Sequence, residues 1–269
     1  MKKILYAFLA SFAVWLVAAL SMLAFSEYLI YSPDFHEGET ADFTYEVDFI
    51  TNSNDDKFQV WFKENKKSSE VILYLHGTGG RNPRYVEELS EYSNVLSPSY
   101  PGFVPSEGIP STKTINEAAV LCINYLKAKG FKEKQITVWG QSLGGSPALY
   151  LAMEYPHLKK VVLINTFDSM KKMGTRRYGP LAFFATNIHN SIEFAKKAKA
   201  KIRQYHVIDD ETVPFFAGIQ LYKHIASSDK KFIPLEKGTH NEFDVWTTLF
   251  VEEVYKSQFV TEPPKMTED

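Results

Sequence analysis

One serine, a pair of aspartates and one histidine follow one another along the chain at positions where they could perform nucleophilic catalysis. Ser142 stands among glycines in GQSLGG, Asp209 and Asp210 lie in VIDDETVP, and His240 lies in KGTHN. A serine hydroxyl attacks a carbonyl carbon only when a base takes its proton, and the base needs an acid that holds its tautomer. The order serine, aspartate, histidine therefore predicts acyl transfer, provided that the fold brings the three groups together.

The serine lies where the apolar run QITVWG gives way to the helix-forming run SPALYLAMEY. A strand followed at once by a helix makes a sharp turn that exposes the hydroxyl of Ser142, and Gly140 and Gly144 leave room for the backbone there. The free amides at the start of the helix, beginning with that of Leu143, would face a negative charge beside the hydroxyl. Glycine and serine are also common in ordinary turns, so this motif predicts catalysis only together with the aspartate and the histidine.

Each partner has a plainer interpretation when it is taken alone. Either aspartate could cap the helix expected after Pro214, and His240 could be a hydrogen-bonded loop residue. His206 falls inside a strand pattern, where a core position is expected. The remaining histidines indicate no partner: His224 falls on a helix, and His36, His157 and His189 lie in polar surroundings.

The glycine-rich loop HGTGG at residues 76–80 directly follows the apolar run VILYL. Such a loop leaves its amides exposed, so the amide of Thr78, or with less weight that of Gly79, can complete an oxyanion hole with Leu143. Phosphate binding is the competing use of a glycine-rich loop. The chain has neither the GK[ST] nor the GxGxxG pattern that this use requires.

The surrounding pattern predicts an α/β fold. Residues 43–49 and 57–63 alternate apolar and polar side chains around the turn NSNDD, which indicates an antiparallel hairpin. Short apolar runs at 71–75, 94–97, 135–139, 160–164 and 204–208 alternate with helical patterns, one of which starts with capping-box spacing at Thr114 and Glu117. This alternation predicts a mostly parallel, doubly wound sheet, which binds ligands at the carboxyl ends of its strands.

The N-terminal segment predicts a membrane anchor. After Lys2 and Lys3, residues 4–25 contain no charge, and a helix of that length crosses the ~30 Å apolar layer of a bilayer. A signal peptide cut near Ser26, which would leave a secreted or periplasmic protein, is the alternative. Lysines before the run and acids after it favour a cytosolic N-terminus, with the rest of the chain on the non-cytoplasmic side.

Composition excludes several other classes. The chain has 269 residues, a formal charge of -2 and a pI near 6.4, so no basic surplus indicates nucleic-acid binding. The single Cys122 permits no intrachain disulfide, and no HExxH pattern indicates a metal site. We expect an anchor at residues 1–30, one catalytic domain at 40–260 and a disordered tail at 261–269.

Taken together, these motifs resemble the α/β-hydrolase superfamily over residues 43 to 257. Within it they resemble the minimal-lid serine hydrolases, a branch with membrane-anchored monoacylglycerol and lysophospholipid lipases and depalmitoylases. HGTGG resembles the family's oxyanion loop, GQSLGG its nucleophile elbow and GTHN the segment that carries the base. DETVP is similar to the D-x-x-V-P that carries the acid, which selects Asp210 over Asp209. The segment SPSYPGFVPSEG departs from the family's D-Y-R-G-x-G-x-S, with Ser99 in place of its acid and Pro101 in place of its basic residue.

The resemblance implies a serine hydrolase for a small-molecule ester or thioester of a lipid-like or acylated substrate, with no metal or organic cofactor. Ser142 would be the nucleophile, His240 the base and Asp210 the acid, with the amides of Thr78 and Leu143 as the oxyanion hole. A short cap at about 166–200 would border the site with apolar residues that contact an acyl chain or pack in the core: Met170, Tyr178, Leu181, Phe183 and Phe184.

Three other functions remain open from the sequence. An acyltransferase would use the same residues and differ only in the acceptor that reaches the acyl-enzyme. A serine peptidase has less support, because nothing resembles a further substrate-gating domain, and a non-catalytic binding protein has no need of the complete serine, aspartate and histidine set. The sequence does not indicate an oligomeric state.

Overall fold

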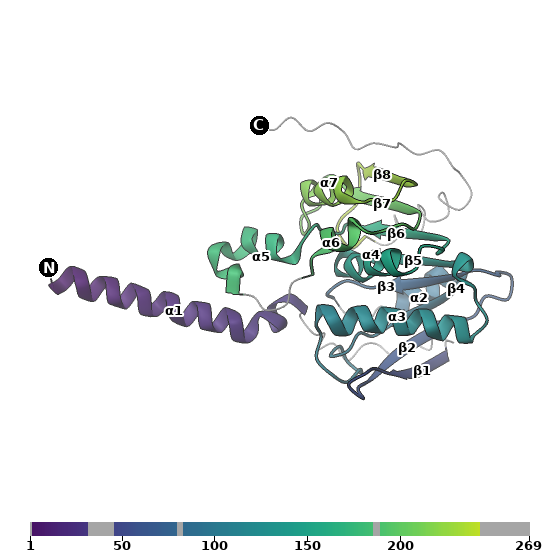
Figure 1. Cartoon of the computed structure of the whole chain (residues 1–269), viewed down its shortest axis with the longest axis horizontal. Coiled ribbons are helices and arrows are strands. Elements are labelled where there is room, and N and C mark those ends of the chain that lie inside the picture. The colour runs from purple at the N-terminus through teal and green to yellow at the C-terminus, as the bar shows by residue number, and fades with distance from the viewer. Residues whose placement is uncertain (1, 32–45, 80–82, 185–188, 243–269) are drawn as a thin grey trace.

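A computed structural model describes residues 2–31, 46–79, 83–184 and 189–242 (Figure 1). Eight strands form one sheet in the order β1-β2-β4-β3-β5-β6-β7-β8. β2 pairs antiparallel with both β1 and β4, and the pairs from β4 to β8 are parallel. The strands are β1 Glu46–Thr51, β2 Lys57–Lys63, β3 Val71–Leu75, β4 Asn94–Pro98, β5 Ile136–Gln141, β6 Lys160–Ile164, β7 Ile202–Val207 and β8 Lys230–Leu235.

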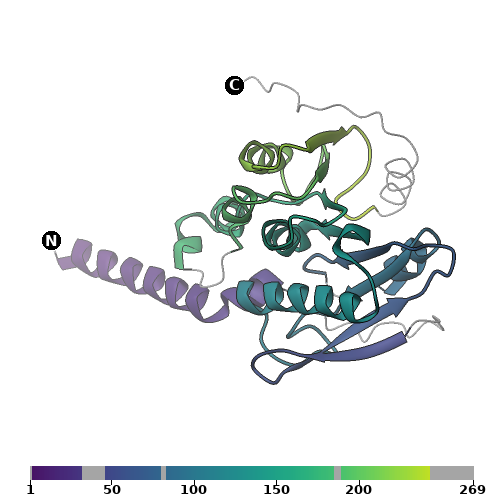
Figure 2. The same ribbon diagram turned by 45° about the vertical axis from the view of Figure 1, so that its right-hand side comes forward.

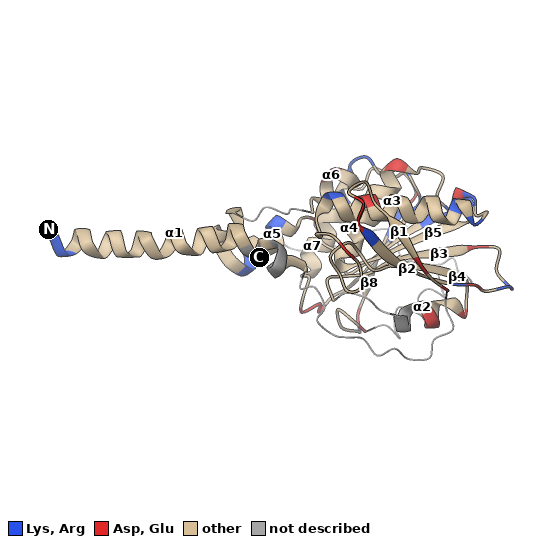
Figure 3. Cartoon of the chain, turned by 90° about the horizontal axis from the view of Figure 1, so that it is seen from below, with Lys and Arg blue, Asp and Glu red and all other residues tan. Residues whose placement is uncertain are grey.

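Helices lie on both faces of this sheet (Figure 3). The α-helices are α1 Lys2–Tyr31, α2 Pro83–Ser90, α3 Thr112–Ala128, α4 Gly145–Glu154, α5 Met170–Tyr178, α6 Ser191–Ala195 and α7 Phe215–His224, with short 3-10 turns η1 Glu133–Gln135, η2 Ser142–Gly144 and η3 Gly179–Phe184. α2 covers one face, and α3, α4 and α6 cover the other. The predicted doubly wound α/β sheet with an antiparallel N-terminal hairpin is confirmed.

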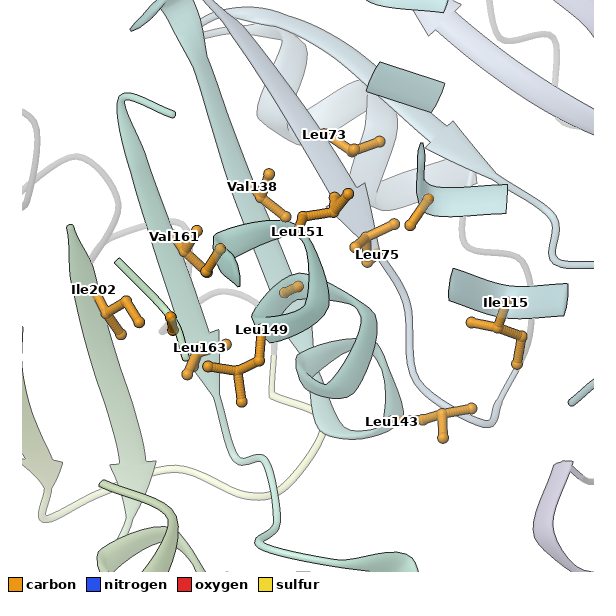
Figure 4. Packing of buried hydrophobic residues seen from close by; sticks show 14 of the residues in the cluster. Leu73, Leu75, Ile115, Val138, Leu143, Leu149, Leu151, Val161, Leu163 and Ile202 are labelled. Carbon is orange, nitrogen blue, oxygen red and sulfur yellow. The ribbon is translucent and has the colours of Figure 1, made fainter. Parts of the chain in front are cut away.

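Alternation along the central strands divides the core in two. Leu73 and Leu75 of β3 point toward α4 and join the larger cluster, which also contains the apolar faces of α3 and α7 (Figure 4). Ile72 and Tyr74, which alternate with them along the strand, join the smaller cluster with residues of α2. Strands buried on both faces read as continuous apolar runs because each side chain meets a covering layer. β3, β5 and β6 are neighbouring parallel strands, so this packing holds their carboxyl ends at the same edge of the sheet.

The predicted strands 57–63, 71–75 and 160–164 have the observed bounds, and the others differ by one to three residues where they are described. Residues 43–45 of the first predicted strand lie outside the described part. The sequence interpretation missed β8, whose Lys230, Lys231 and Pro234 break the apolar pattern. An edge strand tolerates proline and charge because one side has no partner strand.

The capping-box prediction at α3 was wrong by one turn. Ser111 is the N-cap, its side chain accepts from the amide of Thr114, and the Thr114 side chain accepts from the amide of Ser111. Glu117 instead accepts a hydrogen bond of 2.7 Å from the backbone of Ser53 in the β1–β2 turn. The helix therefore starts at Thr112, earlier than Thr114 suggested.

α1 is a long helix that projects from the body (Figures 1 and 2). Its stretch Lys2–Ala24 has a mean hydropathy of 2.2 and the length to cross a membrane, and only 11% of it is buried. The core helix of a soluble protein would be mostly buried, so that alternative is disfavoured. The C-terminal part of α1 reaches the body, where Tyr31 is fully buried.

Candidate active site

Ser142 lies at the sharp turn between β5 and α4. Its φ of +51° lies in the left-handed region, which a non-glycine residue adopts only under local constraint. A Cβ at Gly144 would lie 2.0 Å from the carbonyl oxygen of Leu75, and one at Gly140 would lie 2.5 Å from the carbonyl oxygen of Gly144. Only glycine fits these two close approaches, which is the packing reason for the GQSLGG pattern.

Ser142, His240 and Asp210 form one chain of hydrogen bonds. The Ser142 Oγ lies 3.0 Å from Nε2 of His240, and Nδ1 of the same ring lies 2.8 Å from Oδ2 and 3.0 Å from Oδ1 of Asp210. A carboxylate only accepts, so Nδ1 carries the proton and Nε2 is free to accept from the serine. The three residues expose 9%, 4% and 8% of their surface, so this chain lies largely out of water.

Asp210 also organises the turn after β7. Its Oδ1 accepts hydrogen bonds from the backbone amides of Thr212, at 2.8 Å, and Val213, at 2.7 Å. Asp209 is exposed. The capping interpretation and the catalytic interpretation of the aspartate pair are therefore compatible, because the same Asp210 carboxylate accepts from the turn amides and faces His240.

Residues that the sequence interpretation missed hold the His240 loop. The His240 carbonyl accepts from Nδ2 of Asn165 at 3.2 Å and from Nε2 of Gln141 at 3.4 Å. Oδ1 of Asn165 accepts from the amide of Val207, and the hydroxyl of Thr166 donates to the carbonyl of Ser142 at 2.7 Å. Asn165 and Thr166 directly follow β6, so their place at the carboxyl edge of a predicted strand was the available signal.

The HGTGG loop packs against the elbow. A Cβ at Gly77 would lie 3.2 Å from the Cβ of Ser142, and Thr78 lines the same cavity as Ser142. Gly79 is exposed and has open space around it. Leu143, the second residue of η2, is fully buried and is not among the residues that line this cavity.

A cavity of about 650 Å³ opens beside Ser142. Its lining comes from the loops at the sheet edge, from the cap and from α1: Met22, Ser26, Ile30, Thr78, Ser142, Phe167, Met170, Lys171, Met173, Gly174, Arg176, Arg177, Tyr178, Ala182, Thr212, Val213 and Pro214. Of the predicted rim, Met170 and Tyr178 belong to this lining. Phe183 and Phe184 lie on η3, where Phe184 packs edge-on against Trp15 of α1 with ring centroids 5.4 Å apart.

Two further histidines are buried. His206 donates from Nε2 to the carbonyl of Val213 at 3.0 Å and lies against Gly218, and burial lowers its pKa. The interpretation of His189 as a residue in polar surroundings was wrong. It is fully buried, with Nε2 3.0 Å from the Tyr31 hydroxyl and Nδ1 3.3 Å from that of Ser146, and burial lowers its pKa to about 4. Its sequence neighbours are polar, but its partners come from distant elements.

No group of three or more histidine, cysteine or carboxylate side chains in the described ranges is arranged to hold a metal ion. Cys122 is buried in the core, where burial raises the pKa of its thiol far above the usual range. A buried neutral thiol is a poor nucleophile and a poor metal ligand.

Comparison with known proteins indicates the same fold. The family model for the alpha/beta hydrolase fold matches residues 70–197, which include the elbow. The protein bem46 of Schizosaccharomyces pombe is 29% identical over 260 residues, 88% of this chain and 87% of its own. An uncharacterized membrane protein of Saccharomyces cerevisiae is 29% identical over 69% of this chain and 70% of its own. The lysophosphatidylserine lipase ABHD12 of Gallus gallus is 30% identical over 65% of this chain, but only 52% of its own length is covered.

Solved structures show the same fold at low identity. The Pyrococcus furiosus esterase Pf2001 superposes with a TM-score of 0.68 at 17% identity, over 82% of this chain and 94% of its own. The Butyrivibrio proteoclasticus protein Est1E superposes with a TM-score of 0.61 at 17% identity, over 78% of this chain and 100% of its own. Together, the sheet order, the elbow at the end of β5 and these relatives show the α/β-hydrolase fold, and they support the superfamily and the branch predicted from the motifs.

Proposed function

We propose that the protein is a serine hydrolase that cleaves carboxylic esters or thioesters. The observation that carries this proposal is the hydrogen-bonded chain from Ser142 through His240 to Asp210, which ends at a cavity large enough for an acyl substrate. The esterase and lipase names among the relatives point to the same chemistry.

The geometry supports a two-step reaction. Ser142 Oγ attacks the acyl carbonyl carbon while Nε2 of His240 takes its proton, and Asp210 stabilises the resulting imidazolium. The amides of Thr78 and Leu143 would hold the oxyanion, a contribution of about 3 kcal/mol per donor to the transition state. His240 then gives its proton to the leaving group, and water, activated by the same imidazole, releases the acid and restores Ser142.

Replacing the nucleophile tests this proposal directly. We expect Ser142→Ala to abolish hydrolysis of p-nitrophenyl acetate and labelling by a fluorophosphonate probe, because the Ser142 hydroxyl is the group hydrogen-bonded to Nε2 of His240. The exposed Ser69, far from the cavity, supplies the matched control Ser69→Ala, which should retain both signals. Undiminished labelling of the purified Ser142→Ala protein would overturn the assignment.

The cavity lining supports a substrate with an anionic group. Its described residues include three cations, Lys171, Arg176 and Arg177, and no carboxylate. All three are on α5, next to the helix that has the length and composition to cross a membrane. We therefore propose a membrane lipid ester with an anionic head group as the substrate, in keeping with the lysophosphatidylserine lipase name of one relative.

Neutralising two of these cations tests the head-group proposal. We expect Arg176→Gln with Arg177→Gln to raise KM for an anionic lysophospholipid about tenfold, since each lost charge pair costs up to ~1 kcal/mol at an exposed site. Hydrolysis of uncharged monoacylglycerol should change less than twofold. Lys197→Gln, an exposed cation outside the cavity, is the control. An equal loss on both lipids would contradict charge recognition.

Anchoring through α1 is supported by its composition and by the yeast membrane protein among the relatives. The lysines at positions 2 and 3 favour a cytosolic N-terminus, which would put the catalytic domain on the non-cytoplasmic side. Protease protection of the domain in sealed vesicles tests this orientation.

A further inference from the structure

α1 passes without a break from its membrane-spanning stretch into the wall of the candidate active site. Met22, Ser26 and Ile30 all line the cavity that contains Ser142. They recur at every fourth position, so they share one face of the helix. Met22 still belongs to the apolar stretch Lys2–Ala24, whereas Ser26 and Ile30 lie beyond it. The wall therefore starts at the level where the helix would leave the bilayer.

The end of this helix is held by the element that carries the nucleophile turn. The Tyr31 hydroxyl lies 3.0 Å from Nε2 of His189, whose Nδ1 lies 3.3 Å from the hydroxyl of Ser146. Ser146 is on α4, one turn after Ser142. The Tyr31 ring also packs edge-on against Phe103 and His189. These buried contacts hold α1 at a set position relative to Ser142.

The middle of α1 contacts the cap. Trp15 packs against Phe184, and α1 contacts η3. η3 also carries Phe183, which is 69% exposed and has the Lys171 ammonium 4.3 Å from its ring centroid. The cap therefore packs against the apolar stretch of α1 itself, within Lys2–Ala24.

We propose that Met22, Ser26 and Ile30 of the anchor helix determine acyl-chain specificity, and that the acyl chain reaches Ser142 along this helix from the bilayer. The proposal rests on the ester hydrolysis proposed above. Ile30 lies eight positions after Met22 on the helix, which makes a wall about 12 Å long. Met22 and Ile30 are apolar, so contact with methylene groups of a chain is favourable there. The anchor is then a part of the substrate site as well as a tether.

A bulky side chain at the membrane end of the wall tests the proposal in the full-length protein in detergent micelles. We expect Met22→Trp to lower the ratio of kcat/KM for p-nitrophenyl palmitate to that for p-nitrophenyl acetate at least tenfold, because the ring obstructs a long chain. Leu23→Trp is the matched control, since Leu23 neighbours Met22 but is 47% exposed and does not line the cavity. Its ratio should stay within twofold of the wild type.

Fluorophosphonate labelling shows whether each variant is folded. If Met22→Trp fails to label, Ile30→Trp is scored in the same way. Equal ratios for the wild type and a labelled wall variant, or an equal fall in the Leu23→Trp control, would overturn the role of α1 while leaving ester hydrolysis intact. A wild type that hydrolyses neither ester would instead overturn the proposed function, and the specificity proposal with it.

Discussion

At the scale of single residues, the backbone around Ser142 and His240 is held by side chains that take no part in the proposed proton transfer. Asn165 is the clearest case, because it adopts a φ of +46° and makes two buried hydrogen bonds. One bond, to the amide of Val207, ties it to the strand that leads to Asp210. The other, to the carbonyl of His240, ties it to the base. Asn165 therefore connects the segments that carry the proposed acid and base, and we expect it to position them.

We expect Asn165→Gly to lower kcat for a short ester about tenfold or more, with KM changed less than threefold. Glycine adopts the same backbone conformation without strain, so the loss isolates the two side-chain hydrogen bonds. A shift of the base by about 1 Å can cost up to a hundredfold in rate. Stopped-flow or steady-state kinetics on p-nitrophenyl acetate measures this split.

Asp55→Gly is the matched control for that substitution. Asp55 also has a positive φ, of 65°, but it is exposed in the β1–β2 turn, away from the cavity. It should therefore keep the wild-type kcat. A kcat for Asn165→Gly equal to that of this control would show that His240 is positioned without Asn165.

At the scale of elements, the sequence predicted what local patterns encode. The runs at 71–75 and 160–164 are β3 and β6 with the observed bounds, because strands covered on both faces consist of apolar residues alone. β8 lacks that pattern, and α5, MKKMGTRRY, has no buried residue among those described. Such elements are held by neighbours that a local window does not contain.

The candidate site also contains residues that a local motif predicts and residues whose contacts depend on distant neighbours. Ser142, Asp210 and His240 each carry a local motif at the end of an element, and the structure brings them together as expected. Asn165 has no such motif, and Gln141 lies inside GQSLGG without a signal for its partner, because the contacts of both depend on β5, β6 and β7 being neighbours in the sheet. The contribution of α1 to the cavity could not be predicted from the sequence either. An uninterrupted apolar run does not distinguish the helix face that meets protein from the face that meets lipid.

At the scale of the whole molecule, the buried His189 joins α1 to α4 of the α/β body. Burial lowers the pKa of His189 from its ordinary value of 6.5 to about 4. Between those values the unfolded chain binds a proton there and the folded chain does not, so folding loses stability as the pH falls from about 6.5 to about 4. Below about 4 both states are protonated and this loss is complete.

We expect this histidine alone to cost about 3 kcal/mol of unfolding free energy over that range, since each pKa unit corresponds to ~1.4 kcal/mol. Unfolding followed at pH 7, 5.5 and 4.5 in one non-ionic detergent measures the loss. His189→Gln should show a smaller fall, although not a zero one, because burial lowers the pKa of His206 in the same direction. The exposed His157 gives the control His157→Gln, which should follow the wild type. If His189→Gln also follows the wild type, the proton that weakens the fold in acid binds elsewhere, and the joint between α1 and α4 does not sense pH.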